Sequence, residues 1–145
     1  MPKFIPIRAQ TDEQIERCFP VMSELRTHLR RELFLAQIRL MEDEGYRLAY
    51  IEEDKEVVSV AGFRIYTNLF MGKNLYVDDL VTSERHRSKR HGETMLAWLR
   101  KTAIDNDCRY LHLDSGTQRH RAHRFYFRQG LNIASYHFSE ALKAT

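Results

Sequence analysis

The sequence lacks any apolar run approaching the roughly 20 residues that a membrane-spanning helix needs. Proline and glycine are scarce, at 3 and 6 of 145 residues, whereas aromatic residues make up 11%, a composition that argues against disorder. The first ten residues hold neither the apolar stretch nor the cleavage site of a secretory signal. We therefore expect one domain spanning residues 1–145, a cytoplasmic location and no membrane partner.

Cysteine is also rare. Cys18 and Cys108 are far apart and match no metal-binding spacing, so we expect two reduced thiols in the core of a cytoplasmic protein. No other group of His, Cys, Asp or Glu has the spacing of a metal site, so we expect no metal.

Charge of one sign is concentrated in two stretches, although the formal net charge is only +3. Residues 85–91 (RHRSKRH) and 119–128 (RHRAHRFYFR) hold eight of the 23 Lys and Arg residues and none of the 20 acidic ones. Such an excess predicts an anionic ligand or a solvated basic face. Nucleic-acid binding favours a broader basic surface, so a compact anion site is our main interpretation and a non-catalytic, nucleic-acid-binding module is the alternative.

Hydrophobic periodicity predicts alternating strands and helices. Strand patterns cover 4–8, 46–52, 56–67, 75–82, 109–114 and 131–142, with turns at 53–55 and 72–74, and Leu111 and Leu113 are expected to be buried. Helical patterns cover 15–29 with a kink at Pro20, 34–45, 95–103 and 122–129, the last ending at Gly130. This order predicts a mixed α/β domain, with a mostly antiparallel central sheet and helices on both faces.

The most informative unit is an apolar strand, a basic loop, a glycine and an amphipathic helix within residues 75–100. The first helical turn has free N–H groups and a partial positive charge, and Gly92 allows a ligand to approach the backbone. Arg87, Lys89 and Arg90 add full charges. These features predict a phosphate or pyrophosphate site, with a solvated basic turn as the alternative.

Two motifs resemble those of a known family. Residues 80–92 (LVTSERHRSKRHG) resemble the acetyl-coenzyme A signature of the GNAT superfamily of N-acetyltransferases, Q/R-x-x-G-x-G/A, with Arg87 and Gly92 in its first and last places. Residues 122–131 (AHRFYFRQGL) resemble the family's A-x-x-F-Y-x-x-x-G-F segment, with Leu131 for the usual Phe. The length and element order agree with the family over nearly the whole chain.

The resemblance implies acetyl-CoA as the acetyl donor, an amine as the acceptor, and a homodimer as the family-level expectation. Backbone groups of residues 80–82 would face the pantetheine and the thioester carbonyl. The expected cofactor-binding residues are Leu80, Val81, Thr82, Arg87, Ser88, Lys89, Arg90, His91, Gly92, Glu93, Arg119 and Ala122.

Two positions depart from the family pattern. Arg90 stands where the family usually has its first glycine, and it suits the site provided that its φ is not positive, since a positive φ would reshape the loop. Arg119 stands where the family often has an asparagine, and it would either replace that hydrogen bond or reach the phosphates. A degenerate domain that retains CoA without catalysis is therefore a further alternative.

Acetyl transfer to an amine requires a group that takes the ammonium proton and an acid for the departing thiolate. Residues 75–81 (LYVDDLV) resemble the acid-acid segment of spermidine/spermine N-acetyltransferases, which implies Asp78 as base, directly or through water, and Asp79 as a residue that holds the amine. Tyr126 matches the family's tyrosine that protonates the leaving sulfur. The alternatives are arginine-paired structural carboxylates and a core tyrosine.

Strand geometry places the two carboxylates on opposite faces or diverging around a bulge, with Asp78 on the face of Tyr76 and Leu80. The first two helices carry both signs of charge, at Glu24, Arg26, Arg30, Arg31 and Glu32. The acids favour a cationic small amine, the arginines favour an acceptor with a carboxylate or phosphate, and a protein amine stays open. We expect structural or solvent-facing roles for His112, His120 and His123.

Overall fold

The computed structural model describes residues 4–144, except for the side chain of Ser88. The described residues up to Leu113 form one compact unit, and those from Asp114 onward form a second. Within residues 4–144, no helix is both long and apolar enough to cross a membrane.

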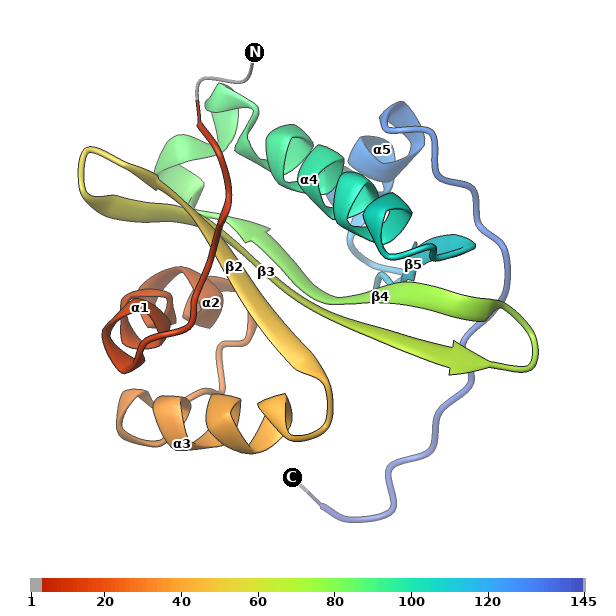
Figure 1. Cartoon of the computed structure of the whole chain (residues 1–145), viewed down its shortest axis with the longest axis horizontal. Coiled ribbons are helices and arrows are strands. Elements are labelled where there is room, and N and C mark those ends of the chain that lie inside the picture. Colours follow the sequence, from red (N-terminus) through yellow and green to blue (C-terminus); the bar gives the residue numbers. More distant parts are fainter. Residues whose placement is uncertain (1–3, 145) are drawn as a thin grey trace. The chain divides into compact units, whose positions relative to one another are not determined.

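A five-stranded sheet in the order β1-β2-β3-β4-β5 forms the centre of the first unit (Figure 1). The first four strands are antiparallel neighbours, and the last runs parallel to β4: β1 (Ile7–Arg8), β2 (Tyr46–Glu53), β3 (Glu56–Asn68), β4 (Gly72–Thr82) and β5 (Tyr110–Leu113). The predicted hairpin at residues 53–55 is confirmed, since Asp54 and Lys55 form its turn with positive φ.

Two local predictions for the sheet are wrong. Residues 69–71, rather than 72–74, make the second turn, because the Asn68 side chain accepts the Met71 N–H at 2.7 Å and β4 begins at Gly72. Leu111 and Leu113 are half-buried rather than buried, since β5 is the last strand of the described sheet.

Three helices precede the hairpin: α1 (Asp12–Arg17), α2 (Phe19–Leu25) and α3 (Arg31–Glu42). Thr11 and Gln14 form the predicted capping box at the start of α1. The prediction of one kinked helix over 15–29 is wrong, because the chain breaks at Cys18 into two helices. Pro20 lies in the first turn of α2, where its missing N–H costs no helical hydrogen bond.

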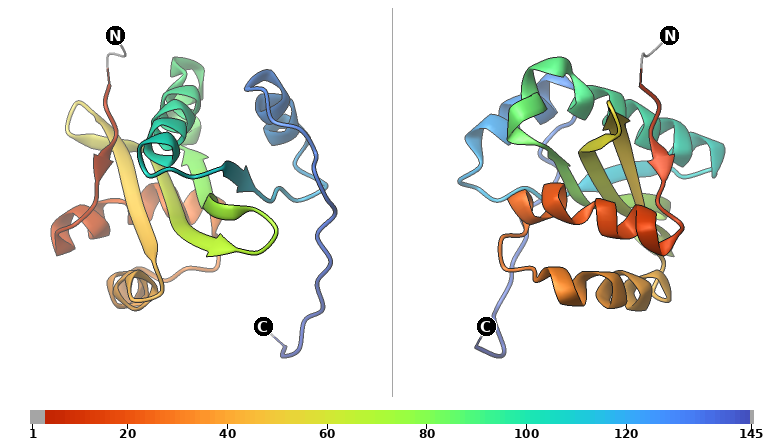
Figure 2. Two further views of the ribbon diagram at one scale, coloured as in Figure 1. Left: turned by 45° about the vertical axis from the view of Figure 1, so that its right-hand side comes forward. Right: turned by 90° about the vertical axis from the view of Figure 1, so that its left-hand side faces the viewer.

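Apolar side chains on both faces of the sheet are covered by helices. Tyr46, Leu48, Tyr50 and Val60 pack on one face with residues of α1, α2 and α3, including Ile15, Met22, Phe34 and Ile38. The other face is covered by α4 (His91–Asp105), as Figure 2 shows. This helix buries Met95, Leu96 and Leu99, and its Trp98 ring lies 5.8 Å from the ring of Phe63. The predicted mixed sheet with helices on both faces is thus confirmed.

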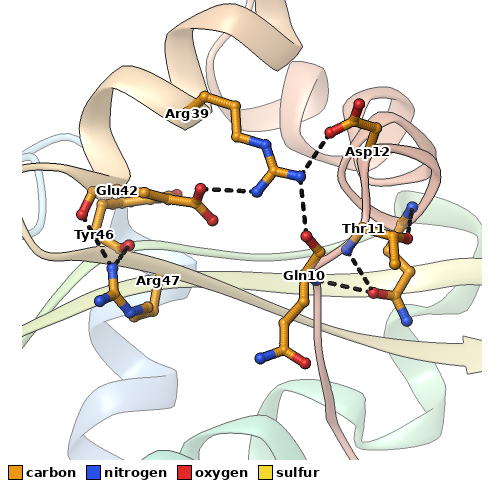
Figure 3. Close-up of polar contacts among 8 residues, drawn as sticks. Gln10, Thr11, Asp12, Arg39, Glu42, Tyr46 and Arg47 are labelled. Carbon is orange, nitrogen blue, oxygen red and sulfur yellow. Dashed lines mark hydrogen bonds and ion pairs between the residues drawn. The ribbon is translucent and has the colours of Figure 1, made fainter.

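Arg39 of α3 links the start of α1 to the end of α3 (Figure 3). Its guanidinium donates to the Asp12 carboxylate at 2.6 Å, to the Gln10 carbonyl at 2.9 Å and to Glu42 at 2.9 Å. Arg47 donates to the carbonyls of Glu42 and Tyr46, at 3.1 and 2.8 Å. These bonds fix the junction from which Tyr46 enters the sheet.

The basic stretch after β4 is more ordered than the predicted loop. It forms a 3₁₀ helix, η1 (Glu84–Lys89), followed by Arg90 and then α4. The Glu24 carboxylate of α2 accepts the backbone N–H of Glu84 at 2.9 Å, which links the helical layer to the start of η1.

The second unit contains α5 (His120–Arg128), which ends before Gly130 at φ 88°, as predicted. The predicted strand over 131–142 is wrong: the described residues that follow α5 form no strand, and Ile133, Tyr136 and Phe138 are exposed. A strand needs a hydrogen-bonded neighbour as well as alternating side chains, and the sequence pattern reports only the alternation.

Candidate active site

A β-bulge brings Asp78 and Asp79 to one face of β4. Asp79 lies opposite Gly62 of β3, and the next pair joins Val77 to Phe63, so Asp78 is the extra residue. Both carboxylates contact groups on the face covered by α2 and α3. The expectation that the two carboxylates lie on opposite faces or diverge is therefore wrong. The bulge also shifts the alternation of side chains along β4, so Leu80 lies on the opposite face from Asp78.

Asp79 is held by two donors. The Tyr46 hydroxyl donates to Oδ2 at 2.7 Å, and Nε of Arg26 donates to Oδ1 at 2.8 Å, while the carboxylate side chain is 11% exposed. Burial, followed by the nearby charge of Asp79, raises the pKa of Tyr46 well above its ordinary value, so the hydroxyl stays protonated and donates.

Asp78 is paired with Arg64, whose Nε lies 3.1 Å from Oδ2 and 3.3 Å from Oδ1. The Asp78 side chain is 20% exposed. Burial raises the pKa of Asp78, the charge of Arg64 opposes this rise, and the charge of Asp79 adds to it. A carboxylate with a raised pKa accepts a proton more readily than an exposed one, as a general base requires. Both acids do have arginine partners, as the structural alternative foresaw.

Tyr46, Gly62 and Arg64 are site residues that the sequence analysis missed. A Cβ on Gly62 would lie 1.8 Å from the Tyr46 hydroxyl oxygen, so the glycine makes room for this ring opposite the bulge. An isolated glycine in a strand of β-branched residues is the signal that could have found it, since such a glycine often marks a bulge or a close approach.

Beyond the bulge, one edge of β4 has no neighbouring strand. β5 pairs with β4 only at residues 74–77. The Ser83 N–H bonds to the Val58 carbonyl of β3, so the alternation of the ladder turns the backbone groups of Leu80 and Thr82 away from β3. No strand among residues 4–144 pairs with that edge, which leaves N–H and C=O groups free to bind an extended ligand.

Arg90 links η1 to α4 in a left-handed conformation, with φ 63° and ψ 24°. The expectation that the φ of Arg90 is not positive is therefore wrong. Arg90 is the one residue between η1 and α4, and the change of chain direction falls on it. For a residue other than glycine this conformation costs about 1–2 kcal/mol. The first helical hydrogen bond of α4 runs from the Thr94 N–H to the Arg90 carbonyl. The N–H groups of residues 91–93 therefore have no acceptor within the helix.

The cations of this loop divide into two groups. Arg85 pairs with Glu56, and Lys89 donates to Glu53 at 3.1 Å. Arg87 and Arg90 are exposed and have no ion pair among the described residues. An anion beside the start of α4 would therefore meet two arginines that no described carboxylate already pairs.

Glu53 anchors this loop from the end of β2. Its carboxylate lies 3.1 Å from Lys89, 3.7 Å from His91 Nε2 and 4.0 Å from His86 Nε2. The hydrogen bond from Lys89 is the main cause that lowers the pKa of Glu53. Burial lowers the pKa of His91, so this ring favours its neutral form despite the nearby carboxylate.

Three further sequence-predicted residues lie in the second unit. Ala122 and Tyr126 are half-buried on one face of α5, and Arg119 precedes its first turn. Burial raises the pKa of Tyr126, and the charge of Arg119 has the smaller, opposite effect. The tyrosine hydroxyl is therefore protonated at neutral pH.

The two cysteines and His112 lie outside the residues assigned to this site. Cys18 is buried, which raises the pKa of its thiol to about 12, whereas Cys108 is half-buried rather than part of the core. Both are free thiols. His112 Nε2 lies 2.7 Å from Oδ1 of the buried Asn74, a structural contact. Across the described part of the chain, no cluster of His, Cys, Asp and Glu is arranged to hold a metal ion.

Comparison with known proteins agrees with this geometry. Residues 9–131 match the model of the acetyltransferase (GNAT) family. The chain is 34% identical over 132 residues to the uncharacterized N-acetyltransferase YhdJ of Bacillus subtilis (strain 168), covering 87% of this chain and 90% of that protein. The protein therefore belongs to the GNAT acetyltransferase family.

Solved structures share its fold at low sequence identity. AAC(6')-Iy in complex with the bisubstrate analog CoA-S-monomethyl-acetylneamine has a TM-score of 0.82 at 10% identity, covering 99% of this chain and 100% of that chain. Glucosamine-6-phosphate N-acetyltransferase from Arabidopsis thaliana has a TM-score of 0.78 at 18% identity, covering 98% and 100%. These likenesses confirm a GNAT-like α/β fold.

Proposed function

We propose that this protein is an acetyl-CoA-dependent N-acetyltransferase that transfers the acetyl group directly to a primary amine of a small molecule. The observation that carries the proposal is the open edge of β4 at Leu80 and Thr82, which leads into η1 and the first turn of α4. An extended thioester arm needs backbone partners and a diphosphate needs N–H groups and cations, and this path supplies both.

Acetyl-CoA is the donor substrate, and its thioester supplies the acetyl group. We assign the pantetheine to the backbone of residues 80–82. The diphosphate is assigned to the first turn of α4 and to the loop before it, that is, to Arg87, Ser88, Lys89, Arg90, His91, Gly92 and Glu93. Arg119 and Ala122 are assigned by their motif positions. No metal is part of the proposal.

The chain's own residues then carry out the proton transfers. An alkyl ammonium has a pKa near 10.4, so a base must take its proton before the nitrogen attacks the thioester carbon. We propose that Asp78 accepts this proton, directly or through water, and that Asp79 binds the amine. As the C–S bond breaks, Tyr126 donates its hydroxyl proton to the thiolate, a role supported by its motif and by burial that keeps it protonated. The attacking nitrogen then gives up its remaining extra proton, which returns to the tyrosinate directly or through water and leaves a neutral amide.

Two neighbours in fold space support a small-molecule acceptor. One is a glucosamine-6-phosphate N-acetyltransferase, and the other was solved with a CoA-linked acetylneamine analog. A cytoplasmic location and a homodimer stay predictions. The departure from the family motif at Arg90 leaves a second candidate, a GNAT domain that binds CoA without catalysis.

Two measurements test the proposal together. We expect calorimetry to detect acetyl-CoA binding at sub-millimolar ligand, and a mixed panel of amines to yield products heavier by one acetyl group. Binding without any acetylated product would favour the non-catalytic CoA-binding domain. No acetyl-CoA binding, with salt-sensitive binding of nucleic acid instead, would favour the basic binding module.

A further inference from the structure

The acid pair of the active site is balanced by two arginines. Arg26 bonds to Asp79 and Arg64 bonds to Asp78, so the four side chains together carry no net charge. Tyr46, which completes the cluster, is neutral. A polycationic acceptor therefore gains no net electrostatic attraction from this cluster.

Arg26 is held rigidly while part of it remains free. It follows α2 directly, and its Nε donates to Asp79 Oδ1 while its Nη2 donates to the backbone carbonyl of Asp78, both at 2.8 Å. The side chain is 44% exposed, and no described residue accepts a hydrogen bond from Nη1. A fixed guanidinium with a free donor is preorganised to bind an oxyanion, because little side-chain entropy is lost on binding.

Arg64, like Arg26, uses two of its three guanidinium nitrogens in hydrogen bonds, but it is less accessible. Its Nε is shared between the two oxygens of Asp78, its Nη1 donates to the Glu44 carbonyl at 3.3 Å, and its guanidinium lies 5.6 Å from the centre of the Tyr46 ring. Its side chain is also less exposed than that of Arg26. Of the two arginines, Arg26 is the one available to a ligand.

We infer that the acceptor carries an oxyanion, a carboxylate or a phosphate, close to its amine, and that Arg26 binds this group while Asp78 takes the proton of the amine. Arg26 is then the residue that determines acceptor specificity. The inference rests on the proposed acetyl-transfer function and narrows it: it selects the oxyanion-bearing acceptor over the cationic one, both of which the sequence left open.

Matched acceptors test the inference on the wild-type protein. One set shares a two-carbon spacing: ethanolamine, β-alanine, 2-aminoethyl phosphate and 1,2-diaminoethane. A second pair is alanine and alaninamide. KM is expressed as the concentration of neutral amine, so that differences in amine pKa do not affect the comparison. At least one oxyanion-bearing amine should then have a KM roughly tenfold or more below that of its uncharged partner, with a similar kcat. Comparing β-alanine with 2-aminoethyl phosphate separates carboxylate from phosphate.

A variant then assigns the preference to Arg26. Arg26→Gln should reduce the KM ratio between the oxyanion-bearing and uncharged partners to about one. A loss of structure alone would weaken both partners alike. Arg30→Gln is the matched control, because Arg30 lies in the same linker, pairs with Glu32 and is 67% exposed, and it should leave the ratio unchanged.

The outcomes separate the inference from the function on which it rests. Acetylation of uncharged amines or the diamine as efficiently as their oxyanion-bearing partners would overturn the inference alone. An Arg26→Gln variant that retains the wild-type KM ratio would also overturn the inference alone. Acetylation of no amine of either kind would overturn the proposed function, and the inference with it.

Discussion

The Tyr46 hydroxyl donates a 2.7 Å hydrogen bond to the Asp79 carboxylate, across a gap that Gly62 leaves open beneath the ring. Tyr46 begins β2 and Asp79 follows the bulge of β4, so one bond joins two strands that are not neighbours in the sheet. This bond, with those of Arg26 and Arg64, determines where the acid pair lies.

Replacing Tyr46 with Phe should lower the free energy of unfolding by about 1–3 kcal/mol, because a partly buried carboxylate loses a donor. Urea unfolding followed by circular dichroism measures this change. Tyr50→Phe is the matched control, since Tyr50 is a buried tyrosine of the same strand whose hydroxyl has no hydrogen bond among the described residues, and it should cost less. Equal losses in the two variants would contradict a special role for the Tyr46–Asp79 bond.

The pH dependence of kcat/KM should report Asp78. Burial raises its pKa above the ordinary 3.8, and the base works only when ionised, so activity should fall on the acid side with a midpoint above pH 3.8. Because the charge of Arg64 opposes the rise, Arg64→Gln should move that midpoint to higher pH.

Asp78→Asn should remove this acid limb together with most of the activity. Because the pKa of Asp78 is higher in the folded state than in the unfolded state, its ionisation lowers the folding stability as the pH rises above the unfolded-state pKa. Asp78→Asn cannot ionise, so this variant should remain folded at neutral pH. Arg47→Gln serves as the control for Arg64→Gln, because the acceptors of Arg47 among residues 4–144 are backbone carbonyls. An unmoved limb in Arg64→Gln, or a limb retained in Asp78→Asn, would exclude Asp78 as the base.

Much of this arrangement could be predicted from the sequence, and the failures have physical reasons. The order of strand, cationic segment and helix around residues 80–92 was predicted correctly, since apolar periodicity and charge are local properties, but the 3₁₀ helix η1 within the segment was not predicted. The convergence of Asp78 and Asp79 was missed because a bulge depends on the opposite strand, at Gly62. The Arg26 contact was missed for a similar reason: its partners lie more than 50 residues away.

Arg90→Gly should raise the thermal midpoint, because glycine adopts φ 63° without the cost of about 1–2 kcal/mol that arginine bears. The same change removes a cation from the proposed diphosphate site, so acetyl-CoA affinity should fall while stability rises. Differential scanning calorimetry and titration measure the two effects. Arg87→Gly, within η1, removes a cation without relieving a positive φ, so it should weaken binding and lower stability. A lower midpoint in Arg90→Gly would contradict the strain at this position.

Tyr126→Phe should lower kcat by about 10²–10⁴-fold, the usual contribution of one general acid, with little change in acetyl-CoA affinity. The half-buried ring keeps its apolar contacts in this variant, so the fold should be preserved. Steady-state kinetics with calorimetric binding separates the two quantities. Turnover equal to that of the wild type would remove the tyrosine from the acid role.

A crystal structure of the protein with bound CoA would show the proposed cofactor site itself. We predict the diphosphate at the first turn of α4, beside Arg87 and Arg90, and the pantetheine hydrogen-bonded along β4 to the backbone of Leu80 and Thr82. A diphosphate bound elsewhere, or a pantetheine that makes no bond to this edge of β4, would contradict it.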